Sequence, residues 1–478
     1  MSNNELSGSK HHIMSLLASF RDPSGFMFEQ QGILYRQINS IYQENYDLLM
    51  SGGLYTRLVE EDLLVRHHEV NDIEYPRRDT YKVICPERIR HISYPYEWCF
   101  SQLKEAALLT LDIELIALAY NMTLKDASGY NIQFQQGRPV MIDTLSFEKY
   151  VEGRPWTAYR QFCQHFLATI ALMSKKDVRL NKLLLAYIDG IPLDLASSLL
   201  PRSSWFNAGL LIHLHIHALT QKKYSATGST TSDHKKENRP VRKVALVEIL
   251  KGLRRTVAKL ECRFEGTEWG NYYAATNYSD AATQAKQALV HQFLEKAQPA
   301  DVWDLGGNTG VYSRIATAMG IPTICFDIDP AAVDFNYQQV RHNNETLLLP
   351  LLLDLTNPSP GLGWEGCERD SFARRGPVDC VMALALIHHL AISNNLPFDK
   401  IASFLGKLCR YLIIEFVPKE DSQVQRLLSS REDIFAQYDQ SSFELTFLKY
   451  FEIICQEQIM NSHRILYLMK KKTACINQ

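Results

Sequence analysis

The chain has 478 residues, of which 46% are hydrophobic and 22% are charged, and its formal net charge at pH 7 is −2. This length and composition predict an ordinary soluble globular protein with two or three domains. The balanced charge excludes a bulk basic field for nucleic acid or membrane surfaces, and no apolar run approaches the roughly 20 residues needed to span a bilayer.

The ten cysteines are scattered without a C-x-x-C pair. We therefore expect neither a disulfide framework nor a zinc knuckle, and a reducing cytoplasmic location is the simplest interpretation. The first twelve residues, MSNNELSGSKHH, lack the apolar core of a signal peptide. The sequence leaves the oligomeric state open.

The first 220 residues mix short strands and helices. A β-hairpin is predicted around Gln30–Gly32, because Phe26 and Phe28 precede this turn and Ile33–Tyr35 follow it. Hydrophobic spacing predicts four further elements, which are a strand over 81–84 and helices over 37–50, 97–121 and 157–174. This mixture predicts an α+β N-terminal domain.

A polar motif lies between the last two of these helices. Asp126 and Asn131 are five residues apart, and two short predicted strands then lead to Asp143. This order resembles the catalytic loop and metal-binding aspartate of protein kinases and small-molecule phosphotransferases. The sequence departs from that pattern in three ways: Lys125 replaces the usual arginine or histidine, a Thr-Leu pair follows Asp143, and neither a G-x-G-x-x-G loop nor a partner lysine is recognisable upstream.

Two interpretations of this motif stay open. In a degenerate kinase-like domain, Asn131 and Asp143 would converge on one cleft, close enough to share a magnesium ion, and the domain would serve recognition without phosphotransfer of its own. In a plain β-hairpin, Asp126 would cap a turn and Asp143 would point to solvent. A phosphotransferase carried by this domain is a further alternative.

Three histidines alternate near the end of the N-terminal half, at His213, His215 and His217. On a strand they would share one face and could hold a metal ion. The flanking leucines favour a helix instead, on which the three side chains spread around the axis. We therefore expect no metal site in the protein.

Gln221–Pro240 is polar, rich in Ser and Thr, and without apolar periodicity. This composition predicts an exposed linker. The expected organisation is an N-terminal domain over 1–220, a linker over 221–242, and a C-terminal domain over 243–478 that begins with an amphipathic helix.

The stretch Asp301–Gly310, DVWDLGGNTG, joins a predicted strand to a predicted helix through a glycine-rich turn. Glycines let the backbone take positive φ and approach a ligand closely, and free N–H groups at the helix start face the same bend. This pattern predicts a nucleotide pocket at the carboxyl end of a strand. It does not match the dinucleotide fingerprint G-x-G-x-x-G, because Asn308 stands where a central glycine is wanted and Asp304 would face a pyrophosphate unfavourably.

The D-x-G-x-x-x-G run of Asp304, Gly306 and Gly310 resembles motif I of the class I S-adenosylmethionine-dependent methyltransferases. That motif usually reads D-x-G-x-G-x-G, and this sequence departs from it at Asn308. Asparagine tolerates positive φ better than most residues, so we expect the loop to keep its shape. The resemblance covers about Ala281–Lys472.

Strand and helix alternate along this half, which predicts a parallel sheet with helices on both faces. A link of only a few residues joins the last two strands and predicts an antiparallel hairpin. The expected fold is therefore α/β, with a seven-stranded Rossmann-like methyltransferase sheet whose last strand is antiparallel, after a separate α+β N-terminal domain. The strands are expected over 302–305, 323–326, 347–353, 378–384, 411–417, 451–459 and 464–469, and the helices over 281–296, 330–342, 401–409 and most of 421–438.

The resemblance implies that the glycine-rich turn holds S-adenosyl-L-methionine as cofactor. Gly306, Gly307, Asn308 and Gly310 would bring the backbone close to the methionine portion of the cofactor. Asp304 would face its positively charged end. Aromatic residues upstream of the first strand often close over the nucleotide in this family, so Trp269 and Tyr273 in the segment 268–278 either cover the cofactor or pack in the core.

The carboxylates at the ends of the next two strands have implied roles as well. Asp327 would accept hydrogen bonds from the ribose hydroxyls, with Asp329 as the alternative, and Asp354 would accept from the adenine amine. His388 and His389 follow the fourth strand, and either could be a general base for an O–H or N–H acceptor or could only line the cofactor pocket.

The methyl acceptor is not named by the sequence. The fourth strand ends in neither the N-P-P-Y type signature of amino-group methyltransferases nor the Pro-Cys nucleophile of cytosine C5 enzymes. We expect a small-molecule acceptor, no nucleic acid partner, and an N-terminal domain that recognises the acceptor. A non-catalytic cofactor-binding protein and a two-domain phosphotransferase and methyltransferase remain the alternatives.

Overall fold

The computed structural model describes residues 14–15, 19–71, 73, 79–219, 240–264, 280–429 and 432–472. Except for residues 240–242, the predicted linker lies outside the described residues, as does the aromatic segment over 268–278. Within the described part of the chain, no helix is both long enough and apolar enough to cross a membrane.

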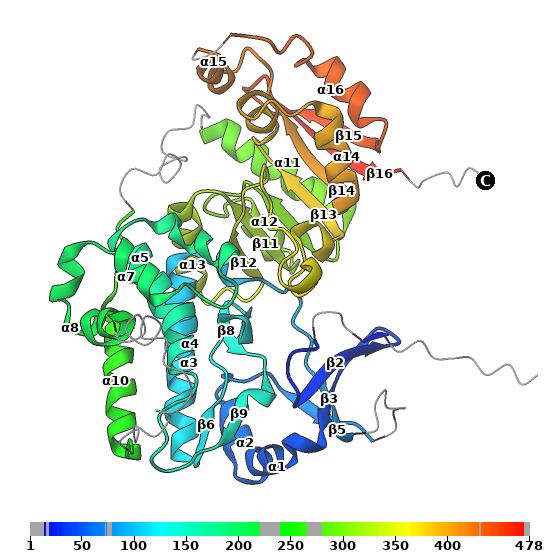
Figure 1. The fold of residues 1–478 in the computed structure, drawn as a ribbon. Coiled ribbons are helices and arrows are strands. Elements are labelled where there is room, and N and C mark those ends of the chain that lie inside the picture. The colour runs from blue at the N-terminus through cyan, green and yellow to red at the C-terminus, as the bar shows by residue number, and fades with distance from the viewer. Residues whose placement is uncertain are drawn as a thin grey trace, which may run out of the picture.

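The chain begins with a five-stranded antiparallel sheet, which lies at the lower right of Figure 1. The predicted hairpin is confirmed: its strands β2 and β3 meet at Gln31 and Gly32, whose φ angles are 55° and 77°. In spatial order the strands are β1 (Met14–Ser15), β2 (Gly25–Gln30), β3 (Ile33–Asn39), β5 (Thr80–Pro86) and β4 (His67–Glu69).

The helix predicted over 37–50 begins later than expected. Residues Gln37–Asn39 belong to β3, where Gln37 pairs with Val83 of β5 and its amide donates to Asn39 Oδ1 at 2.8 Å. A strand partner more than forty residues away therefore overrides the local helical spacing. The helices that follow are α1 (Gln43–Ser51) and α2 (Leu54–Glu60).

The rest of the N-terminal half is built around the long buried helix α3 (Phe100–Ala119). The helix α10 (Lys243–Lys259) packs along α3 and also contacts α8, so it belongs spatially to this half. Between them lie the short strand pairs β6 (Met122–Leu124) with β9 (Phe147–Lys149) and β7 (Ile132–Gln135) with β8 (Arg138–Met141), and the helices α4 (Tyr159–Phe162), α5 (Ala168–Lys175), α6 (Leu183–Ala186), α7 (Leu193–Leu199) and α8 (Ala208–Leu210).

The C-terminal half contains the predicted seven-stranded sheet. Its first five strands are parallel, and β16 runs antiparallel between β14 and β15. The antiparallel ending is therefore confirmed. In spatial order the strands are β12 (Leu348–Leu352), β11 (Thr323–Asp327), β10 (Val302–Leu305), β13 (Val378–Ala383), β14 (Cys409–Phe416), β16 (Ile465–Lys471) and β15 (Phe451–Gln458).

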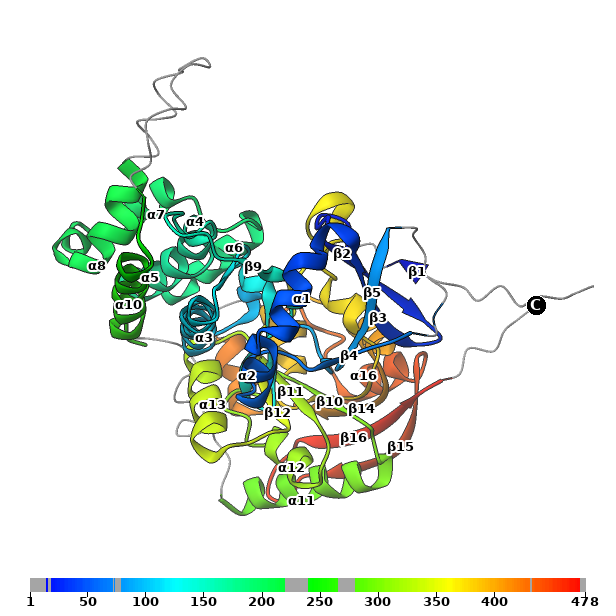
Figure 2. The ribbon, with the colours of Figure 1, turned by 90° about the horizontal axis from the view of Figure 1, so that it is seen from below.

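Alternate residues of these strands face opposite layers. Val302 packs in the cluster with α11 (Asp280–Ala297) and α12 (Ser313–Ala318), whereas Trp303 and Leu305 join the larger core that includes α14 (Phe398–Leu408) and α16 (Gln440–Phe447). Figure 2 shows α11 and α12 together on one side of the sheet. The helix α13 (Pro330–Asn343) contacts β11 and β12 and also α3 of the N-terminal half.

The helix predicted over most of 421–438 is shorter in the structure. Only α15 (Ser422–Leu428) forms, and residues 432–438 are turn or irregular backbone. Asp433 Oδ1 accepts a hydrogen bond from the backbone N–H of Phe435 at 3.0 Å, which is the local side-chain contact that competes with a helix.

The two halves share one continuous hydrophobic core, which runs from α3 to the seven-stranded sheet. Polar contacts reinforce this junction. Arg375 and Glu97 form a buried ion pair at 2.5 Å, and Asp334 of α13 accepts from the backbone N–H and hydroxyl of Ser101 at 2.7 and 2.9 Å. The N-terminal region is therefore packed on the sheet as part of the same body.

Candidate active site

The glycine-rich turn after β10 has the predicted backbone shape. Gly306, Asn308 and Gly310 have φ angles of 74°, 50° and 79°. The backbone N–H groups of Gly306 and Gly307 both donate to the carbonyl of Phe326, at 2.8 and 3.0 Å, which ties the turn to the end of β11. A Cβ at Gly307 would lie 2.6 Å from Cys325 Sγ, so no larger residue fits there.

The turn opens onto a cavity of about 440 Å³ at the carboxyl ends of the parallel strands. This volume lies in the range of small-molecule sites. The lining includes one carboxylate at the end of each of β10, β11 and β12. Of the residues that the sequence singled out, Asp304, Gly306, Gly307, Asn308, Asp327, Asp354 and His389 line this cavity.

Asp327 holds the turn as well as facing the cavity. Its Oδ2 accepts from the backbone N–H of Asn308 at 2.8 Å and its Oδ1 from that of Asp329 at 2.9 Å. Burial raises the pKa of Asp327 to about 6, although these backbone hydrogen bonds favour the charged form.

Asp304 is buried between the turn and the start of α12. Its Oδ2 accepts from the hydroxyl of Ser313 at 2.6 Å. Burial raises the pKa of Asp304 to about 6, against the opposing effects of this hydrogen bond and of the Lys286 charge. The cavity therefore has two carboxyl groups whose negative charge is under-compensated, and this arrangement favours a cationic ligand.

The other two predicted carboxylates are used differently. Asp354 lines the cavity, and its Oδ1 accepts from the backbone N–H and hydroxyl of Thr356 at 2.8 and 2.6 Å. Asp329 caps the N-terminus of α13, where its Oδ1 accepts from Ala331 N at 2.8 Å. Asp329 thus has the helix-capping role of a turn residue.

The two histidines lie after β13, with ring centroids 4.1 Å apart. His389 begins a π-helical turn, His389–Ser393, and lines the cavity, whereas His388 is buried beside it. Burial, with a smaller effect of the Arg464 charge, lowers the pKa of His389 to about 4, and burial also places the pKa of His388 well below its usual range. Both rings are therefore neutral at pH 7.

Sequence analysis missed a buried charge network at the wall of the cavity, which Lys286 itself lines. Lys286 Nζ of α11 contacts Glu415 Oε2 of β14 at 2.6 Å, and Arg464 contacts Glu415 at 3.4 Å and Asp421 at 2.7 Å. Glu415 Oε2 also accepts from the backbone N–H of Ala385, whose φ is 51°. The network thus fixes the backbone that follows β13, next to the glycine turn.

Two signals in the sequence could have revealed this network. Lys286 lies on the buried stripe of α11 between Ala282 and Val290, and Glu415 interrupts the apolar strand YLIIEFV. A charged residue at a core position needs a partner. Arg464 is distant in sequence from Lys286 and Glu415, so its contact with Glu415 is seen only in the folded structure.

The aspartates of the N-terminal motif form a closed cluster. Asp143 contacts Arg36 of β3 at 2.5 Å and accepts from the Ser146 hydroxyl at 2.6 Å, and Asn131 donates to the same hydroxyl at 3.1 Å. The expectation that Asp143 points to solvent in a plain hairpin is therefore wrong, because only 15% of its side chain is exposed. Asp126 caps a turn, accepting from Ser128 N at 2.9 Å.

The three alternating histidines lie in or beside a π-helical turn, Leu211–Ile216, where His213 and His215 bond to hydroxyls and His217 packs against the Tyr159 ring. His213 pairs with the Tyr159 hydroxyl at 2.7 Å, and His215 lies 2.8 Å from the Ser197 hydroxyl. Among the described residues, no cluster of three His, Cys, Asp or Glu side chains could hold a metal ion.

A parallel sheet that ends in an antiparallel hairpin distinguishes class I methyltransferases from dinucleotide-binding folds, and the C-terminal half of this protein has that sheet behind a D-x-G-x-x-x-G turn. The protein is thus a class I methyltransferase in fold. It is 33% identical over 465 residues to Nodulation protein NoeA of Rhizobium meliloti (strain 1021), and the alignment covers 95% of each chain. The chain belongs to the NoeA family.

Two solved structures show more distant likenesses. Magnesium protoporphyrin IX methyltransferase (ChlM) from Synechocystis PCC 6803, with bound SAH, is 17% identical with a TM-score of 0.31, over 43% of this chain and 93% of that one. The bifunctional kinase-methyltransferase WbdD is 17% identical with a TM-score of 0.29, over 43% and 42%. No family model matches the sequence.

Proposed function

We propose that this protein is an S-adenosyl-L-methionine-dependent methyltransferase with a small-molecule acceptor. The observation that carries the proposal is the cavity at the glycine turn, where Asp304, Asp327 and Asp354 come from the ends of three neighbouring strands. Three carboxylates in this order suit a ligand that has a positive charge at one end and hydrogen-bond donors at the other.

The residues present fit this cofactor. The left-handed backbone at Gly306, which lines the cavity, would give close access to the methionine portion, whereas Gly310 allows close packing of the turn, since a Cβ there would lie 2.6 Å from Asn336 Nδ2. The cofactor's sulfonium charge would offset the cost of holding Asp304 ionised at a buried position. The remaining lone pairs of Asp327 would accept from the ribose hydroxyls, and Asp354 would accept from the adenine amine.

The chemistry that the bound cofactor supplies is a methyl group on a good leaving group, open to in-line displacement. The protein's part is to position two reactants and to exclude water. The turn and the Lys286–Glu415 pair fix the walls of the cavity, since Glu415 holds the backbone of Ala385 in place. Because these groups are already bonded, they need little rearrangement when ligands bind.

His389 is the best-placed proton acceptor. It lines the cavity and its ring is neutral at pH 7, so it can take a proton from an O–H or N–H acceptor, but its lowered pKa of about 4 makes it a weaker base than an exposed histidine. His388 is buried behind it and would act on His389 rather than on the acceptor.

We further propose that the N-terminal region recognises the acceptor and does not transfer phosphoryl groups. Its five-stranded sheet and the meeting of Asn131 with Asp143 at Ser146 favour a kinase-like relationship. However, Asp143 is already neutralised by Arg36, which leaves it poorly suited to hold magnesium. Since α10 packs on α3, we place the start of the methyltransferase region after residue 264.

Calorimetry with S-adenosylmethionine and with NAD tests the cofactor. We expect binding of S-adenosylmethionine alone, and binding of NAD alone would overturn the proposal. A methyl-transfer assay over candidate acceptors then distinguishes an enzyme from a non-catalytic binding protein.

Titration with a fluorescent ATP analogue and magnesium tests the N-terminal region: tight binding that Asp143→Ala abolishes would make this a two-activity enzyme.

A further inference from the structure

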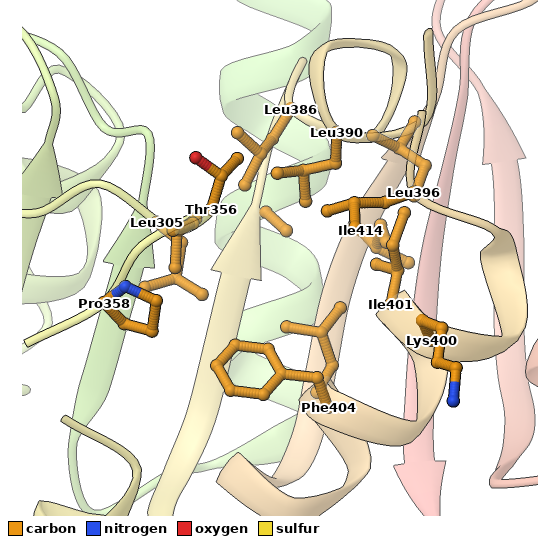
Figure 3. Close-up of a pocket in the computed structure, with 14 residues that line it drawn as sticks. Leu305, Thr356, Pro358, Leu386, Leu390, Leu396, Lys400, Ile401, Phe404 and Ile414 are labelled. Atoms are coloured by element: carbon orange, nitrogen blue, oxygen red, sulfur yellow. The ribbon is translucent and has the colours of Figure 1, made fainter. Parts of the chain in front are cut away.

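A second cavity, of about 270 Å³, lies under the wall of the cofactor cavity. We call it the apolar chamber. It is lined by Leu305, Ala383 and Ile414 of three parallel strands, by Ile401 and Phe404 of α14, and by the segment after β13, and it is partly open to solvent. Figure 3 shows labelled side chains from β10 and β14, from α14 and from the segments after β12 and β13 around one common space.

The chamber adjoins the cofactor cavity directly. Leu355, Thr356, Leu386 and Leu390 line both spaces. Along the segment after β13, Ala385 faces only the cofactor cavity, Leu386 faces both and Ile387 faces only the chamber. One wall of leucines therefore separates the proposed methyl donor from the chamber.

The lining identifies the kind of group that fits. Twelve of the fourteen lining residues are apolar, and the two others are Thr356 and Lys400. The Thr356 hydroxyl already donates to Asp354 Oδ1 at 2.6 Å, and Lys400 is exposed. A sugar or a nucleobase would leave its polar atoms without partners here, whereas a hydrocarbon group would replace water or empty space favourably.

The shape of the wall indicates that the chamber is a built feature. An unfilled apolar pocket leaves its lining atoms without the contacts of a packed interior, and its open part exposes apolar surface to water. The wall segment is also irregular: it contains the π-helical turn His389–Ser393 between Ala385 and Asn395, whose φ angles are 51° and 54°. π-Helical turns and left-handed residues gather at functional sites.

We propose that the apolar chamber binds a hydrocarbon group of the methyl acceptor, an alkyl or acyl chain, while the reactive head of the acceptor lies in the cofactor cavity. This inference rests on the proposed methyltransferase function and adds the acceptor's chemical class to it. The leucine wall then sets which acceptors fit, because the length of the chain must match the depth of the chamber.

The test uses the full-length protein saturated with S-adenosylhomocysteine, titrated calorimetrically with linear alcohols from 1-butanol to 1-decanol. We expect the affinity to rise about fourfold for each added methylene until the chamber is full, and then to level off. Two variants that narrow the chamber, Ile401→Phe and Leu396→Phe, should each weaken 1-octanol binding at least tenfold while S-adenosylhomocysteine still binds. The Leu396→Phe variant guards against a folding defect, because Leu396 is only half-buried and a larger side chain there disturbs the core less.

Leu289→Phe is the matched control, since Leu289 is a half-buried leucine of α11 outside both cavities and should leave 1-octanol binding unchanged. Competition between 1-octanol and S-adenosylhomocysteine would overturn the inference, because the chamber would then be part of the cofactor site. Octanol binding that both narrowing variants leave intact, or no octanol binding beside normal S-adenosylhomocysteine binding, would overturn it as well. Failure of the wild-type protein to bind S-adenosylhomocysteine would instead overturn the proposed function itself.

Discussion

Two groups of aspartates in this protein have pKa values that are shifted in opposite directions. Asp143 in the N-terminal half is buried, which raises its pKa, but Arg36 and the hydrogen bonds from Ser146 and Leu145 outweigh burial and hold the pKa below its usual range. For Asp304 and Asp327 in the C-terminal half, burial outweighs the compensating hydrogen bonds and, at Asp304, the Lys286 charge, so the pKa of each is raised to about 6.

This difference in pKa distinguishes a carboxylate with a structural role from a carboxylate with a binding role. A carboxylate with a protein cation at contact distance has no need of a ligand, whereas an under-compensated carboxylate on a cavity lowers its energy by binding a cation or hydrogen-bond donors. The motif that resembles a phosphotransferase site is the compensated one. The strand ends that resemble a methyltransferase site are the under-compensated ones, because burial outweighs their partners.

The largest expected effect comes from breaking the compensated pair. Arg36→Leu leaves Asp143 buried with no contacting cation, and should cost about 3–5 kcal/mol of unfolding free energy in urea denaturation of the full chain. The double variant Arg36→Leu/Asp143→Leu should recover most of that loss, because both charges are then gone. A single variant as stable as wild type would show that the pair is not buried in solution.

Removing an under-compensated carboxylate should affect binding instead. Asp327→Ala loses charged hydrogen bonds worth about 1.5–3 kcal/mol, so S-adenosylmethionine affinity should fall by one to two decades in calorimetry. Asp329→Ala is the control: it removes the α13 cap, lowers stability by about 0.5–2 kcal/mol and should leave the affinity nearly unchanged. The opposite outcome would place the ribose contact at Asp329.

The raised pKa values predict a pH dependence of binding. In the unliganded protein, the stability that Asp304 and Asp327 contribute is present below the pKa of the unfolded chain and is lost as pH rises through about 6. Cofactor binding favours the charged carboxylates, so affinity should be constant above pH 7 and fall about tenfold per pH unit below 6 for each group that must ionise. An affinity that is flat from pH 5 to 8 would contradict this assignment.

A matched pair of serine variants gives the smallest effect. Ser146 donates to Asp143 and Ser313 donates to Asp304, each at 2.6 Å. Ser146→Ala should lower stability by about 1 kcal/mol with no change in cofactor affinity. Ser313→Ala should raise the pKa of Asp304 further and move the pH midpoint of cofactor binding upward. Equal effects of the two variants on binding would remove the distinction between the two clusters.

Local patterns allowed much of the C-terminal fold to be predicted. The glycine turn, the strand ends at Asp327 and Asp354, and the final hairpin each depend on residues close in sequence, and the structure has all of them. The segment 37–39 was predicted as helix because its strand partner β5 is remote in sequence.

The parts of the site that could not be predicted are contacts between distant segments. Lys286, Glu415 and Arg464 come from three different elements, and nothing in the spacing of the sequence pairs them. Arg36 likewise had no visible relation to Asp143, although it supplies the cation that the N-terminal motif lacked in sequence. The apolar chamber has no sequence signature either, since its lining consists of ordinary core residues.

The buried Glu97–Arg375 pair and the core that runs from α3 into the sheet have an evolutionary consequence. A chain that contained only one half would expose an apolar surface and an unpaired charge, so we expect the halves to be inherited as a unit rather than exchanged as modules. Substitutions on either side of this junction must be matched by changes on the other. Acceptor preference in this family should accordingly change by replacement of individual residues around the cavities rather than by exchange of whole domains.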